Sequence, residues 1–246
     1  MGTMDELDVA AARVDLAAAF RLAVRLDLHE GVCHHFSFML PDRKHFFLNR
    51  YGLHWSEVTA SNLLMLDAEG RVLQGEGEFE KTAFHIHSRI HLANPSAACV
   101  LHTHMPYATA LTLLENGRLE MAEQNALRFY DDIAYDDTYN GLVVDDAEGD
   151  RLARVLGTKR VMFLASHGVI VVGPSIAEAF DLMYYQERAC RLQVLARSMG
   201  AKLRTVRPEV VRTTYRLMLA DAPRYAGAHF GALKRILERE EPDYSR

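Results

Sequence analysis

The sequence has few cysteines and no long apolar run. Its three cysteines, Cys33, Cys99 and Cys190, are odd in number and far apart along 246 residues. Such a set does not form a disulfide framework, so we expect a protein of the reducing cytoplasm. No apolar run approaches the roughly 18 residues of a membrane-spanning helix. The first residues, 1–6, have neither the basic nor the apolar part of a secretion leader, so we expect no membrane partner.

Positive charge is also scarce. The formal net charge is −5, and no run of lysine or arginine marks a surface for a phosphate backbone, so nucleic acid is not an expected partner. Hydrophobic residues make up 49% of the chain, which is enough to bury a full-sized core. We therefore predict a single domain over residues 1–246, with a C-terminal helical tail from about residue 200.

Hydrophobic spacing and turn residues predict alternating helices and short strands. Helices are expected at 7–28, 55–61, 81–93, 107–114, 146–156 and 175–199, with one more near 231–240. Strands are expected at 32–40, 45–49, 63–66, 71–73, 98–105 and 133–135, and as a hairpin over 161–173. Ser175 and Gly200 have the residue types that begin and end a helix. The alternation indicates α/β or α+β layering with antiparallel hairpins.

The residues that organise this chain are a His-x-His pair at the end of an apolar strand. Residues two apart on a strand face the same side, so His102 and His104 can hold one divalent ion. An isolated pair of this kind is more often two hydrogen-bonded histidines. His167 changes the balance, because it lies at a turn between two apolar runs, where we expect Gly168 to adopt a positive φ. Three histidines with an open position are typical of catalytic zinc.

Together with Ser166-His167-Gly168, the run 49–61 and the segment Phe84-His85-Ile86-His87, this pair resembles the class II aldolase/adducin family, in particular its adducin-like bacterial branch. The likeness covers about residues 16–195. It implies an αβα three-layer sandwich on a mainly antiparallel sheet, usually assembled as a homotetramer. It also implies Zn²⁺, or another divalent ion such as Mn²⁺ or Co²⁺, bound by His102, His104 and His167.

Several positions depart from the aldolases of that family. Their catalytic glutamate corresponds to Ala83, and their phosphate-binding loops correspond to Tyr51-Gly52 and Lys81-Thr82. Gly52 matches the pattern, whereas Tyr51 is bulky and aromatic. A family asparagine corresponds to His35, which we expect to reach the site while its strand neighbour His34 faces away. These departures favour a carboxylated or aromatic substrate over a phosphorylated sugar.

Four further residues are candidates for catalysis or substrate binding. His85 is a candidate acid or base near the missing carboxylate, and Tyr130 is a second proton donor. Asn125 and Arg128 could orient a substrate carboxylate, which a guanidinium binds with two hydrogen bonds. The alternative for Arg128 is a solvated surface charge.

The sequence thus predicts a metal-dependent lyase, an aldolase or a decarboxylase, acting on a small carboxylated molecule, with aromatic acids among the candidates. The ion would stabilise the enolate or carbanion left when a carbon–carbon bond breaks. The alternatives are a sugar-phosphate aldolase or epimerase, and a non-enzymatic adducin-like binding protein. A pure binding protein does not need three such histidines, and the C-terminal residues 238–246 lack the basic run on which adducin-type function relies.

Overall fold

An eight-stranded sheet forms the centre of the computed structural model, which describes the backbone of residues 6–246 and side chains from residue 8 onward. The expectation about a secretion leader falls mostly on residues 1–5, outside this range. The helices are α1 (Glu6–Arg25), α2 (Lys81–Ala93), α3 (Pro106–Thr112), α4 (Asp146–Leu156), α5 (Ile176–Ser198) and α6 (Pro208–Glu240). The strands are β1 (His35–Met39), β2 (His45–Leu48), β3 (Leu64–Asp67), β4 (Val72–Gln74), β5 (Cys99–Thr103), β6 (Ile133–Asp136), β7 (Val161–Leu164) and β8 (Gly168–Gly173). Within the described residues, no helix is both long and apolar enough to cross a membrane.

The sheet order is β4-β3-β2-β1-β5-β8-β7-β6, and every neighbouring pair is antiparallel except β6 and β7. β5 lies in the middle, between β1 and β8. Its pairing sets His102 opposite His35 on β1 and Thr103 opposite Val169 on β8. This register brings three segments that are far apart in sequence to one end of the central strands.

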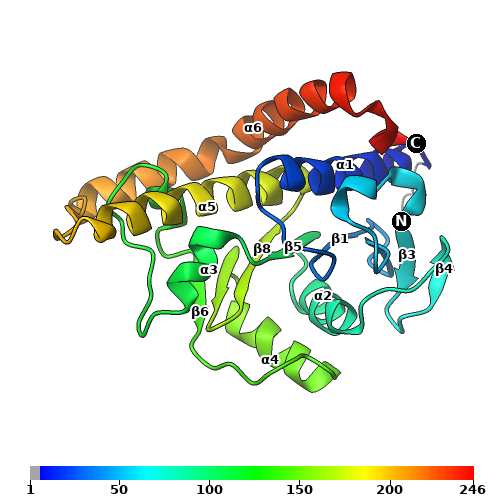
Figure 1. Cartoon of the computed structure of the whole chain (residues 1–246), viewed down its shortest axis with the longest axis horizontal. Coiled ribbons are helices and arrows are strands. Elements are labelled where there is room, and N and C mark those ends of the chain that lie inside the picture. The colour runs from blue at the N-terminus through cyan, green and yellow to red at the C-terminus, as the bar shows by residue number, and fades with distance from the viewer. Residues whose placement is uncertain (1–5) are drawn as a thin grey trace.

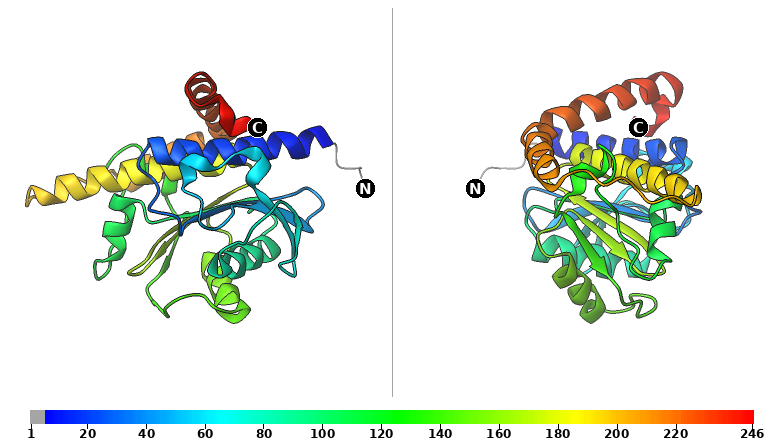
Figure 2. Two further views of the ribbon diagram at one scale, coloured as in Figure 1. Left: turned by 45° about the vertical axis from the view of Figure 1, so that its right-hand side comes forward. Right: turned by 90° about the vertical axis from the view of Figure 1, so that its left-hand side faces the viewer.

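Helices cover both faces of the sheet, so the predicted three-layer α/β sandwich is confirmed (Figures 1 and 2). On one face, α1 and α5 bury a core that includes Phe20 and Phe180 against Leu101. On the other face, α2 and α4 pack against the neighbouring residue Val100 and against Ile170. Successive strand residues point to opposite faces, so β5 contributes to both cores. Helix α6 runs over the α1–α5 layer as an outer element (Figure 2).

Most of the predicted elements exist, and the differences have local causes. The 55–61 segment is two short 3₁₀ turns, Trp55–Glu57 and Ala60–Asn62. β1 begins at His35 rather than at residue 32, because Gly31 has a φ of +55° and starts a turn there. The tail holds one helix of 33 residues where we expected a short one near its end. Pro223 and Gly227 lie inside that helix, and such residues normally indicate a break.

Candidate metal centre

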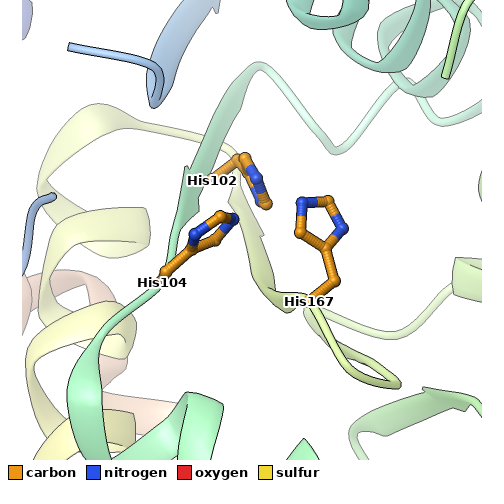
Figure 3. Close-up of side chains that lie close together, drawn as sticks. All are labelled: His102, His104 and His167. Carbon is orange, nitrogen blue, oxygen red and sulfur yellow. The ribbon is translucent and has the colours of Figure 1, made fainter. Parts of the chain in front are cut away.

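Three imidazole rings meet at the end of the central strands. His102 is on β5, His104 follows it by two residues, and His167 lies in the turn between β7 and β8. Each offers one ring nitrogen, and these nitrogens lie within 4.8 Å of one another. Figure 3 shows the three rings gathered around a common point. The same-face pair and the turn histidine therefore meet as their sequence positions predict.

Hydrogen bonds at the outer ring nitrogens fix which atoms face that point. His102 donates from Nδ1 to the Val169 carbonyl at 3.0 Å. His104 donates from Nδ1 to the Glu30 carboxylate, also at 3.0 Å. A neutral imidazole carries one hydrogen, so Nε2 of both rings keeps its lone pair. His104 Nε2 is buried and has no hydrogen-bond partner among the described residues. A divalent ion fits this donor set, since a zinc ion needs unprotonated ring nitrogens at about 2.0–2.1 Å.

Glu30 also approaches a second histidine. Its backbone N–H donates to His34 Nδ1 at 3.1 Å, so the neutral His34 ring carries its hydrogen on Nε2, which lies 3.8 Å from the Glu30 carboxylate. His34 therefore presents no free lone pair beside Glu30. Glu30, His34 and His104 lie close enough to hold an ion. Their hydrogen bonds instead connect them to one another, and the bond from His104 to Glu30 orients the His104 ring.

The turn that holds His167 differs from the expected one. The residue with a positive φ is Ser166, at +55°, and not Gly168. Gly168 is needed for a different reason, because a Cβ there would lie 2.5 Å from His104 Cδ2 and 2.7 Å from the Thr103 carbonyl oxygen. The absence of a side chain at Gly168 lets β8 approach the His104 ring closely.

Burial keeps the rings of His34, His102 and His167 neutral. It lowers the pKa of His167 to about 4, with a further contribution from the nearby His104 ring. It lowers the pKa of His34 to about 3, again helped by His104 and then by His167. The pKa of His102 lies well below its ordinary value, for burial first and then the surrounding imidazoles. Neutral rings at physiological pH are the form that binds metal.

A cavity of about 650 Å³ opens onto the three histidines. His34 and His35 both line it, which corrects the expectation that only His35 reaches the site. His34 precedes the first residue of β1, so strand alternation does not apply to it. Tyr51 and Lys81 lie on the wall as well, and Gly52 lies next to Tyr51 in sequence with a φ of +83°.

The start of α2 forms part of the same wall. Ala83 is 1% exposed and packs in an apolar cluster with Met39 and Phe46, so no carboxylate occupies that position. The helix is capped instead by Glu80, whose carboxylate accepts the Ala83 N–H at 2.8 Å and the Thr82 hydroxyl. Glu78 and Glu80 both line the cavity. Because they are carboxylates on the cavity wall, they are candidates for the acid or base role of the missing glutamate.

Four predicted site residues lie away from the lining of this cavity. His85 points toward α4, where Nδ1 lies 2.8 Å from Asp146. Arg128 lies 3.4 Å from Asp181 and stacks over the Tyr185 ring at 4.0 Å. Asn125 and Tyr130 flank the same 3₁₀ turn as Arg128. Their proposed roles stay predictions.

Sequence reasoning missed several residues that the fold brings to the site. Glu30 reaches His104 from the turn after α1, 74 residues earlier in the chain. Tyr139 and Leu142 line the cavity from the loop between β6 and α4. No local pattern marks them, because their position depends on the packing of distant segments.

Comparison with known proteins identifies the family. Residues 14–194 match the family model described as Class II Aldolase and Adducin N-terminal domain. A Caulobacter vibrioides protein, whose name places it with the class 2 aldolases, is 34% identical over 95% of this chain and 91% of its own length. Mouse alpha-adducin is 33% identical over 74% of this chain, which spans 25% of that protein. The chain therefore belongs to the class II aldolase/adducin family.

Solved structures agree with this assignment. An aldolase II superfamily protein from Pseudomonas syringae matches with a TM-score of 0.90 and 33% identity, and the match covers 96% of both chains. The L-fuculose 1-phosphate aldolase of Glaciozyma antarctica matches with a TM-score of 0.86 at 24% identity, over 100% of this chain and 96% of its own. The second likeness shows that the fold is shared.

Proposed function

We propose that this protein is a metal-dependent carbon–carbon lyase acting on a small carboxylated substrate with an apolar or aromatic part. The observation that carries the proposal is the cavity itself. Its lining includes His102, His104 and His167, and Nε2 of His104 is buried without a hydrogen-bond partner among the described residues. Its walls include Phe79, Ile86 and Leu142. A polar end beside apolar walls suits a ligand with a chelating head and an apolar body.

His102, His104 and His167 would hold the ion, which we propose to be Zn²⁺ or another divalent ion such as Mn²⁺ or Co²⁺. When bound, such an ion supplies Lewis-acid stabilisation for the negative charge that develops as a carbon–carbon bond breaks. Glu30 holds the His104 ring in the tautomer that leaves Nε2 free. Phe79 and Ile86 offer an apolar surface to the carbon skeleton of the substrate, and Glu78 and Glu80, which also line the cavity, are the carboxylates to which we assign proton exchange.

The N-terminus of α2 argues against a phosphate as the anchoring group. A helix N-terminus binds phosphate through its free N–H groups. Here the Glu80 carboxylate already accepts the Ala83 N–H, so an anion of the protein occupies that position. Tyr51 adds a large ring to the same wall, and Lys81 offers a single cation there. This arrangement favours a substrate carboxylate over a sugar phosphate.

The test compares two substrate classes on metal-loaded protein. Carboxylated hydroxy or keto acids with aromatic groups are screened for release of CO₂ and of aldehyde, which separates a decarboxylase from an aldolase. Fuculose- and ribulose-type phosphates are screened alongside and should turn over negligibly. Efficient cleavage of a sugar phosphate would contradict the carboxylate proposal. A protein that binds no divalent ion would instead support an adducin-like binding function.

Assembly is part of the proposal. The described chain leaves large apolar side chains exposed on its two longest helices, α5 and α6. Exposed apolar patches on a folded chain are typical of surfaces that bind another protein. We propose that these helices join copies of this chain into a homo-oligomer, a tetramer.

A further inference from the structure

A chain of buried side chains leads from the cavity into the core behind the metal centre. His35 Nδ1 lies 2.7 Å from His87 Nε2 on α2. His87 Nδ1 lies 2.5 Å from Ser37 Oγ, which lies 2.7 Å from His91 Nε2. The chain ends where His91 Nδ1 meets the Ala97 carbonyl oxygen at 2.7 Å. All four side chains are buried.

Its last member fixes the direction of every hydrogen bond. A carbonyl only accepts, so His91 carries its hydrogen on Nδ1 and accepts at Nε2 from the Ser37 hydroxyl. That hydroxyl has one hydrogen, so its oxygen must accept from His87 Nδ1. His87 then accepts at Nε2 from His35 Nδ1, and His35 keeps a lone pair on Nε2.

These hydrogen-bond directions hold when His35, His87 and His91 are neutral, and all three rings are buried. Among the described residues, no carboxylate hydrogen-bonds His35, His87 or His91. A buried imidazolium without an acidic partner is costly, so each ring carries a single hydrogen. Nothing in the chain then allows the direction to reverse, because every donor and acceptor is used once.

We infer that this chain makes His35 a fixed hydrogen-bond acceptor at the cavity, and thus a specificity residue that selects a substrate bearing a hydroxyl or other donor beside its metal-chelating group. Among the described residues the His35 ring hydrogen-bonds only through Nδ1, which leaves Nε2 without a protein partner, and the ring lines the cavity. The ring also stacks on the metal ligand His102, with centroids 4.8 Å apart. An anionic group placed against this lone pair would be repelled.

Ser37 acts as a positioning residue in this arrangement. It is fully buried and is absent from the cavity lining, so it influences a ligand only through His87 and His35. The chain stops at a carbonyl in the interior, where His91 is also fully buried. It is therefore a network that orients hydrogens and not a route for protons to solvent. The inference rests on the proposed function only in placing the substrate in this cavity.

Neutron diffraction from crystals of metal-free protein in heavy water tests the hydrogen positions directly. We expect deuterium on Nδ1 of His35, His87 and His91, none on His35 Nε2, and a water deuteron directed at that atom. Deuterium on His35 Nε2 would overturn the inference. In Ser37→Ala the fixed order should be lost at His35 and His87 while His91 keeps deuterium on Nδ1. This measurement requires neither bound metal nor enzymatic activity, so its result is independent of the proposed function.

Ligand binding to zinc-loaded protein tests the consequence for specificity. The probes are 2,3-dihydroxypropanoate and 2-hydroxypropanoate, which share a chelating hydroxy acid and differ in one neighbouring hydroxyl. Calorimetry should show a preference of about 3- to 10-fold for the dihydroxy acid, the value of one neutral hydrogen bond. The ratio should fall toward one in Ser37→Ala. The ratio should persist in Ser88→Ala, because Ser88 is a buried serine on α2 that takes no part in the hydrogen bonds linking His35, His87, Ser37 and His91.

An equal ratio in wild type and Ser37→Ala would contradict the specificity role. If neither acid binds, the proposed carboxylate function fails, and the deuterium positions decide the inference about His35.

Discussion

At the scale of single residues, the candidate site depends on the groups that hydrogen-bond the outer ring nitrogens of His102 and His104. Glu30 accepts the Nδ1–H of His104 at 3.0 Å, and the Val169 carbonyl does the same for His102. These contacts hold each ring in the tautomer that leaves Nε2 for an ion. Such partners commonly change metal affinity by 10- to 100-fold when they are removed.

We predict that Glu30→Ala lowers zinc affinity by roughly 10- to 100-fold. Glu30→Gln should have an intermediate effect, because the amide oxygen still accepts the hydrogen but carries no charge. Affinity is measured by competition with a chromophoric chelator. The control is Glu115→Gln, an exposed carboxylate without a hydrogen bond among the described residues. Equal affinity in wild type and Glu30→Ala would contradict the orienting role.

Gly168 allows a second test at this scale. A methyl group there would lie 2.5 Å from His104 Cδ2, closer than real side chains come, so Gly168→Ala should displace the ring and cost most of the bound metal. Gly231→Ala is the matched control, because the nearest atom to its added carbon is 3.6 Å away. Elemental analysis of both proteins gives the readout. Full metal occupancy in Gly168→Ala would show that His104 does not need this close approach.

At the scale of elements, helix α2 joins the cavity wall to the core. Its buried face carries His87 and His91, and its first turn is capped by Glu80. Burial lowers the pKa of His91 to about 4, and the cation of Arg43 lowers it further, although the hydrogen bond to Ala97 raises it. The helix therefore contains a group that resists protonation in the folded protein.

This pKa predicts acid sensitivity. The unfolded chain takes up the His91 proton near pH 6.5, whereas the folded protein takes it up near pH 4. Between these values the unfolded state binds more protons than the folded state. The free energy of unfolding therefore has its full value above pH 6.5 and decreases as the pH drops toward 4. The loss from His91 is roughly 3 kcal/mol, measured by urea unfolding of metal-free protein.

The control for this prediction is His91→Gln, whose amide can still donate to Ala97 and accept from Ser37. Its stability should vary less with pH over the same range. An identical pH dependence in the variant would show that other groups cause the acid sensitivity.

Some elements follow from local sequence and others do not. The helix 146–156 was predicted to the residue, since Asp145 provides an N-cap and Gly157 ends it. Helix α6 was predicted too short, because Pro223 disfavours a helix locally while packing along α5 holds it together. The meeting of His102, His104 and His167 could be predicted because strand periodicity and a turn are local signals.

The residues whose surroundings could not be predicted lie in segments without a period. Arg128 was expected at the substrate, yet Asp181 and Tyr185, more than 50 residues later in sequence, surround it. Conversely, Tyr139 reaches the cavity from a loop with no distinguishing pattern. Such placements depend on how the layers pack, which a single sequence does not encode in any local spacing.

At the scale of the whole molecule, the mainly antiparallel sheet gathers the ligands at one end of its central strands, while α5 and α6 present apolar residues on the outside. Leu192, Leu195 and Met199 are exposed on or just after α5, and Leu217 and Leu219 are exposed on α6. Met199 is 80% exposed and Leu217 is 69% exposed, so both are available for contact with another chain. These two helices are the surface on which we place the subunit contacts.

We predict that light scattering at micromolar concentration gives a mass of four times the 27.8 kDa chain. Leu217→Glu should lower the mass, because it places a charge in the proposed contact. Leu73→Glu, at an exposed leucine on the edge strand β4, should leave the mass unchanged. A monomeric wild-type protein would contradict this assembly.

We propose that His102, His104 and His167 together bind one catalytic ion. The most direct measurement is the metal content of purified protein after reconstitution with zinc, determined by elemental analysis for wild type, His104→Ala and the triple His102→Ala, His104→Ala, His167→Ala variant. We predict about one ion per chain in wild type and none in the variants, all three remaining folded, because a core of this size does not require metal. One ion at full occupancy in the triple variant would contradict the account.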